Sequence, residues 1–156
     1  MKVKNYIYIS FFFLLCLFTT SSCNQQKDTK SVSGTTNSLT AAVNGKSYNA
    51  IHVTGFMATI PNTLLLTGAM GTGEDIQLFL PKEVTPGAYK FEDLLVQGKY
   101  QENEELSGFA TRGTVTITTH DIGKKQIEGT FYFTTKPLVK GNPSFDITEG
   151  MFKIAY

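Results

Sequence analysis

Threonine alternates with aliphatic residues over residues 113–119, which predicts a β-strand with one buried face. Val115 would point into the core. The alternation resumes after a short turn, over residues 127–134, where Phe131 and Phe133 share a face with an isoleucine. A shift of one residue would move both phenylalanines into solvent, so we expect the register of this hairpin to be firmly set.

The first hairpin of the domain is marked by the dipeptide Asn44-Gly45, which stands between two extended runs at residues 39–43 and 46–50. A two-residue type I′ turn needs positive φ at both central residues, and Asn-Gly is the strongest short signal for it. This turn would place Ala41 opposite Tyr48.

Further strands follow from turn dipeptides and short apolar runs. A second hairpin joins residues 55–60 to residues 63–70, and the region 94–100 fits either a strand or a helical turn, of which we favour the strand. The other predicted strands cover residues 75–80, 88–91 and 145–156, with Gly150 as a candidate bulge. Polar loops are expected at residues 101–108 and 137–144.

These signals give about ten short strands with turn residues every 8–12 positions, and no amphipathic helix of useful length. Threonine, glycine and aromatic residues are plentiful, which also favours strands. We therefore predict one all-β domain over residues 39–156, built as an antiparallel, meander-like β-sandwich. A closed up-and-down barrel is the alternative, because local hairpins fit both architectures.

The N-terminal segment has the layout of a lipoprotein signal over residues 1–22. A basic start at Lys2 and Lys4 precedes an apolar run from Tyr6 to Phe18. That run is shorter than the roughly 20 residues that a transmembrane helix needs. Small hydroxyl residues then lead to Cys23, an arrangement that resembles a lipobox, although Thr20 stands where a stricter lipobox has leucine.

Cys23 is the predicted lipidation site and would become the new N-terminus, carrying acyl chains such as palmitate. Several acyl chains hold a protein on a membrane stably, whereas one chain holds it only marginally. Cys16 would be lost with the signal, so the mature domain would contain no disulfide. Residues 23–38 read as the lipidated cysteine and a flexible tether. Asn24 is compatible with the outer membrane of the cell envelope.

Charge excludes one class of partner. Removal of Lys2 and Lys4 leaves twelve basic residues against thirteen acidic ones, without a block of like charge. Nucleic-acid binding needs a basic face, and none is visible. The predicted partner is therefore membrane lipid through Cys23, and we expect no nucleic acid and no cofactor.

The sequence offers no catalytic constellation. His52 and His120 stand in no metal-ligand spacing, and His120 and Asp121 would face opposite ways on an extended chain. Asp121 reads as a turn residue. The pair Gly71 and Gly73 reads as a hairpin turn, because no phosphate-loop lysine follows it.

Carboxylates are the only weak candidates for a metal or catalytic site. Glu102, Glu104 and Glu105 share one loop, with Glu92 and Asp93 nearby in sequence, and oxygen ligands of this kind can bind Ca²⁺. Their spacing fits no calcium loop, so we interpret them as solvated. Four aromatic residues are expected at the surface without forming a binding face, namely Phe79, Tyr89, Tyr100 and Tyr132.

The domain resembles a family of small lipoproteins of the Bacteroidota whose function is unknown. The shared features occur in order along the domain: Ala41-x-Val43-Asn44-Gly45-x-x-Tyr48-x-Ala50, Pro86-Gly87-x-Tyr89, Gly113-Thr114-Val115-Thr116-Ile117-Thr118, Ile127-x-Gly129-Thr130-Phe131-x-Phe133 and Ile147-Thr148-x-Gly150-x-Phe152. The resemblance implies a lipoprotein signal and an all-β domain, and it supplies no catalytic residue.

The sequence thus favours a non-catalytic, lipid-anchored β domain of the cell envelope that acts by binding or by structural association. One alternative is a carrier that encloses an apolar ligand in a barrel. A less favoured alternative is a carbohydrate-active enzyme that uses carboxylates such as Glu92, Asp93 and Glu104.

Overall fold

The structure, a computed structural model, describes residues 36–156, so the predicted signal and Cys23 lie outside the described residues. The described residues belong to one compact unit. Its regular elements are ten strands and one short 3-10 helix: β1 (Ser38–Val43), β2 (Lys46–Asn49), β3 (His52–Met57), β4 (Thr63–Ala69), β5 (Asp75–Pro81), β6 (Gly87–Lys90), η1 (Phe91–Asp93), β7 (Gln97–Gln101), β8 (Ser107–Asp121), β9 (Gln126–Pro137) and β10 (Asp146–Ala155).

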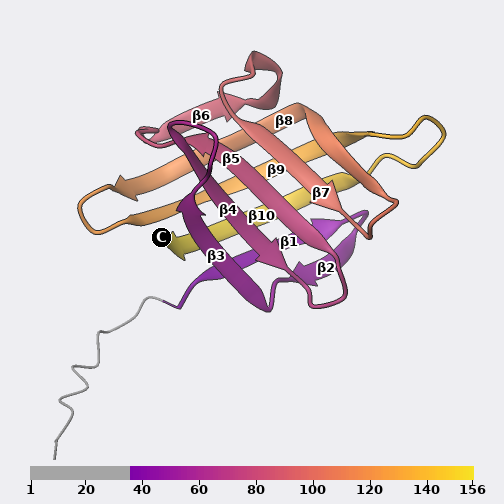
Figure 1. Ribbon diagram of the computed structural model, residues 1–156, viewed down its shortest axis with the longest axis horizontal. Coiled ribbons are helices and arrows are strands. Elements are labelled where there is room, and N and C mark those ends of the chain that lie inside the picture. Colours follow the sequence, from indigo (N-terminus) through magenta and orange to yellow (C-terminus); the bar gives the residue numbers. More distant parts are fainter. Residues whose placement is uncertain (1–35) are drawn as a thin grey trace, which may run out of the picture. The chain divides into compact units, whose positions relative to one another are not determined.

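All ten strands belong to one antiparallel sheet with the order β2-β1-β10-β9-β8-β7-β5-β4-β3, and β6 pairs with β8. The sheet curls, so that β3, β4, β5 and β7 cross over a layer made of β8, β9, β10 and β1 (Figure 1). β8 belongs to both layers, because its first residues pair with β7 and its later residues pair with β6. This arrangement confirms the predicted all-β, sandwich- or barrel-like class.

Gly113 makes the bend in β8 possible. The register of β8 against β9 shifts between Ala110 and Arg112, and Gly113 follows with φ at +124°. A Cβ atom at this position would overlap the carbonyl oxygen of Tyr132. Only glycine fits such a position, so Gly113 determines where β8 bends from one layer into the other.

The core fills the space between the two layers. β4 and β5 contribute alternating, fully buried residues: Leu64, Leu66, Ile76, Leu78 and Leu80. The other layer contributes Val115, Ile117, Ile127, Phe131, Phe133, Phe152 and Ile154. Burying a side chain of this size contributes about 1.5–3 kcal/mol, so this shared core is what holds the two layers together.

The predicted hairpins are confirmed where turn chemistry and alternation agree. Asn44 and Gly45 both have positive φ, and Ala41 lies opposite Tyr48. In the β8–β9 hairpin, Val115 pairs with Phe131, and both side chains are buried. Gly150 follows a register shift in β10 against β9, which confirms the predicted bulge.

Several predicted boundaries were wrong. The first strand of the second hairpin covers His52–Met57 rather than residues 55–60, since the loop closes through a hydrogen bond from the Ala58 N–H to the Thr63 carbonyl. The region 94–100 is a strand only from Gln97 onward, because the 3-10 turn η1 precedes it. β8 and β9 are also long, with 15 and 12 residues.

The start of the domain is held by Asn37, just before β1. Its side-chain amide donates to the carbonyls of Val53 and Ala155, and its carbonyl oxygen accepts the Ala155 N–H at 2.8 Å. Asn37 thereby connects the edge strand β3 to the end of β10, which lies between β1 and β9 in the sheet. Among residues 36–156, no helix is long and apolar enough to cross a membrane.

Candidate functional site

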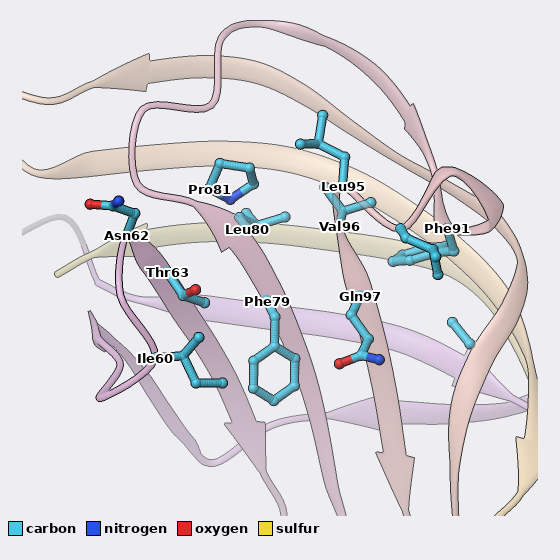
Figure 2. Close-up of a pocket in the computed structure, with 12 residues that line it drawn as sticks. Ile60, Asn62, Thr63, Phe79, Leu80, Pro81, Phe91, Leu95, Val96 and Gln97 are labelled. Carbon is cyan, nitrogen blue, oxygen red and sulfur yellow. The ribbon is translucent and has the colours of Figure 1, made fainter.

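A cleft of about 420 Å³, with nine apolar residues among the twelve that line it, lies at one end of the sheet, and we call it the end cleft. It lies where β5 finishes at Pro81 and β7 begins at Gln97 (Figure 2). Its lining comes from the β3–β4 loop, β4, β5, η1 with the following loop, β7 and β8: Ile60, Asn62, Thr63, Phe79, Leu80, Pro81, Phe91, Leu94, Leu95, Val96, Gln97 and Ala110.

The inner wall of the end cleft is continuous with the protein core. Leu80, Phe91 and Val96 are all buried. Phe91 packs edge-on against Phe133 of β9, with ring centroids 5.3 Å apart. Side chains fixed in this way keep a preformed wall, which is what a binding site for an apolar group requires.

The rim of the end cleft is apolar and exposed. Ile60 and Leu95 are each 57% exposed, and Leu94 is 87% exposed. Leu94 also adopts the left-handed conformation, with φ +58° and ψ +6°. For a residue with a Cβ atom this conformation costs roughly 1–2 kcal/mol, and it is normally left to Gly or Asn. Leu94 ends η1, where its N–H donates to the Phe91 carbonyl, so the turn places a strained and exposed leucine at the rim.

Polar side chains in the end cleft are few and uncharged. Asn62, Thr63 and Gln97 supply amide and hydroxyl groups, and none of the lining side chains carries a charge. The Asn62 carbonyl accepts the Lys82 N–H at 2.8 Å, which holds the β3–β4 loop beside the end of β5. The cleft is therefore suited to an uncharged, mainly apolar group with a few hydrogen-bonding atoms.

The opposite end of the sheet is filled by two tyrosines. Tyr48 Oη donates to the Gly68 carbonyl at 2.6 Å, and Tyr100 Oη donates to Glu74 Oε1 at 2.6 Å. Burial raises the pKa of both phenols, and for Tyr100 the hydrogen bond to Glu74 raises it further. The hollow outside them is about 230 Å³. We call this region the tyrosine end.

His120 is a structural residue. Its Nδ1 lies 2.7 Å from the Val84 carbonyl, and its Nε2 lies 2.7 Å from Tyr156 Oη. A carbonyl only accepts, so Nδ1 carries the proton, and in the neutral ring Nε2 accepts from the Tyr156 hydroxyl. His120 thus connects the β5–β6 loop to the end of the chain.

Asp121 is a turn residue, as predicted. Its Oδ1 accepts the Lys124 N–H at 2.9 Å, and the pKa of Asp121 is lowered chiefly by this hydrogen bond. His52 is exposed on β3.

The acidic residues do not converge. Glu92 and Asp93 lie in η1, whereas Glu102, Glu104 and Glu105 lie in the loop at the other end of β7. Within the described part of the chain, no three His, Cys, Asp or Glu side chains gather as metal ligands. The acids considered from the sequence as Ca²⁺ ligands thus lie in two separate parts of the domain.

The predictions for surface aromatic residues were partly wrong. Tyr100 is 1% exposed and belongs to the core, whereas Tyr132 is exposed as predicted. Phe79 and Tyr89 are half-buried. Sequence reasoning missed the rim of the end cleft, although the apolar pair Leu94-Leu95 after two acids in a loop was a usable signal.

The fold and the end cleft define a class of protein: a small β domain built from one curled sheet, with a cleft at one end. The chain belongs to the family described as "Domain of unknown function (DUF6252)", which it matches over residues 35–154. This match confirms a family of unknown function, while the lipoprotein signal and the Bacteroidota affiliation stay predictions. No curated protein and no solved structure matches the chain.

Proposed function

We propose that this protein is a non-catalytic binding domain, held at the cell envelope by a lipid on Cys23, that takes an uncharged apolar group into the end cleft. The observation that carries the binding role is the rim residue Leu94. Its strained backbone and its 87% exposure both oppose folding, so a bound group that covers it would remove part of that cost.

The volume of the end cleft supports a small molecule as the bound group. Ligand sites typically measure about 300–1,000 Å³, and the cleft is about 420 Å³. This volume also favours a carrier as a second candidate function. Its ligand would bind in the end cleft rather than inside a closed barrel. An apolar side chain of a protein partner would use the same wall.

Binding can be tested with the uncharged fluorescent probe N-phenyl-1-naphthylamine and the complete chain in phosphatidylcholine nanodiscs. We expect Leu95→Ser to weaken probe binding about tenfold, because it removes an apolar wall of the cleft. Leu138→Ser is the matched control, since Leu138 is also 57% exposed but follows β9, away from the lining. Equal binding by both variants and the unaltered chain would refute the end cleft as the site.

The anchor rests on the sequence of the first 23 residues and has its own test. An alkyne analogue of palmitate should label the chain in cells, and Cys23→Ala should abolish both the label and the membrane association. Density fractionation would then show whether the labelled chain is in the outer membrane. If Cys23→Ala leaves the label and the membrane fraction unchanged, the anchor is wrong.

A further inference from the structure

The outer face of β6, β8, β9 and β10 presents one exposed aromatic residue, Tyr132. Tyr132 is 56% exposed, and its Oη accepts a hydrogen bond from Thr114 Oγ1 at 3.3 Å. The two residues are direct partners in the β8–β9 register. Cross-strand partners have Cβ atoms only about 5 Å apart, so the phenol can meet Thr114 only by leaning over β8. Tyr132 therefore leans toward β8 and is still more than half exposed to solvent.

Hollows flank this ring on both sides. One measures about 300 Å³ and is lined by polar residues that include Lys90, Glu92 and Arg112. The other measures about 320 Å³ and is lined in part by Thr116, Thr130 and Met151. Both contain Thr114 and Tyr132, so they form one surface that runs across the strands, which we call the threonine face.

Charge on the threonine face is balanced. The cations Lys90 and Arg112 are accompanied by the acids Glu92 and Glu149. Arg112 is held in place, because its Nε donates to Thr134 Oγ1 at 3.2 Å and Thr134 in turn donates to Asp146 at 2.8 Å. Phosphate backbones and anionic lipids need an excess of cations, so neither fits this face.

The backbone of the threonine face is also unavailable to a partner. β8 is paired on both sides here, by β6 and β9, and β9 is paired on both sides by β8 and β10. A peptide therefore cannot add as an extra strand beside β8 or β9. The groups left for recognition are side-chain hydroxyls, which both donate and accept, around an aromatic ring.

We infer that the threonine face binds a neutral oligosaccharide. The apolar face of a pyranose ring would stack on Tyr132, and the sugar hydroxyls would exchange hydrogen bonds with Thr114, Thr116 and Thr130. Sugars offer many hydroxyls and no charge, which matches the donors, acceptors and balanced charge of this surface. This site is separate from the end cleft and does not depend on the function proposed for that cleft.

Titration calorimetry of the complete chain in nanodiscs with cellohexaose, maltohexaose and mannohexaose tests the inference. We expect at least one of them to bind. Tyr132→Ala should weaken that binding about tenfold, because the stacking surface is lost. Tyr132→Phe keeps the ring and should retain most of the affinity. Leu95→Ser, in the end cleft, should leave sugar binding unchanged.

Two results would overturn the inference. One is that none of the three sugars binds, although circular dichroism and urea unfolding show a folded chain. The other is binding that Tyr132→Ala changes by less than about twofold, which would place the sugar elsewhere. A loss of probe binding in the end cleft would not affect either result, so failure of the two proposals can be distinguished.

Discussion

The two ends of the curled sheet are built from similar strands and differ in how they finish. At the tyrosine end, Tyr48 and Tyr100 enter the core, and their hydroxyls bond to Gly68 and Glu74. At the end cleft, the exposed Leu94 and its neighbours leave a hollow. Both ends contain large apolar side chains, so composition alone does not separate them.

The difference shows what a polar tip on an aromatic ring does. A tyrosine can be buried and still satisfy a backbone carbonyl, so it both fills space and closes an end of the sheet. A leucine side chain makes no hydrogen bonds, and the loop that contains Leu94 and Leu95 leaves both side chains exposed. We therefore expect the tyrosine end to carry stability and the end cleft to carry binding.

The largest expected effect is from truncation at the tyrosine end. Tyr100→Ala should lower the free energy of unfolding by about 3–5 kcal/mol, because it opens a cavity and removes the edge contact with Phe145. Leu95→Ala should change it by less than about 0.5 kcal/mol, as is usual for exposed sites. Urea unfolding measures both changes in the free energy of unfolding. Equal losses in the two variants would show that the two ends do not differ in stability.

Removing only a hydroxyl separates packing from hydrogen bonding. Tyr48→Phe should cost about 1–3 kcal/mol, because the buried Gly68 carbonyl loses its phenol donor. Tyr89→Phe is the control, since its hydroxyl donates to the Thr85 carbonyl at an exposed position. If the two variants unfold at the same urea concentration, the hydrogen bond at the tyrosine end is not a source of stability.

Alkaline pH should act on the same end. The pKa values of Tyr48 and Tyr100 are raised in the fold, so above pH about 10 the folded state holds more protons than the unfolded chain. Stability should therefore be complete below that pH and fall as the pH rises beyond it. In the double variant Tyr48→Phe with Tyr100→Phe, the melting temperature in thermal scans should fall less steeply as the pH rises. An equally steep fall would contradict the assignment of this pH dependence to the two phenols.

The smallest effect is expected at the end cleft and has the opposite sign. Leu94→Asn should raise the free energy of unfolding by up to about 1 kcal/mol, because Asn tolerates positive φ and Leu does not. The same change at Leu138 should be close to neutral. A clear loss of stability in Leu94→Asn would mean that Leu94 packs in the fold rather than serving the cleft.

Most of the fold could be predicted from the sequence because local rules agree with the tertiary structure. Asn44-Gly45 determines a turn through its backbone preferences, and the alternation around Val115 and Phe131 determines a face and a register. The curling of the sheet could not be predicted, because it depends on Gly113 accommodating the carbonyl of Tyr132, which belongs to another strand.

The candidate site was less accessible to sequence reasoning. Tyr100 was expected at the surface, but its burial depends on Phe145 and Glu74, which are distant in the chain. The end cleft combines Ile60 with Leu80 and Leu95, and no periodicity relates these positions. Binding surfaces are made by loops that the fold brings together, so their parts become visible only in three dimensions.

The pairing of β1 with β10 has a consequence for how the chain folds during synthesis. β1 lies between β2 and β10, so the first strand stays without one neighbour until the last strand is available. Asn44 and Asp146, which are hydrogen-bonded to each other, are likewise 102 residues apart. Long-range pairing of this kind slows folding, commonly to about milliseconds or seconds. The sheet can therefore be completed only after β10 has been made.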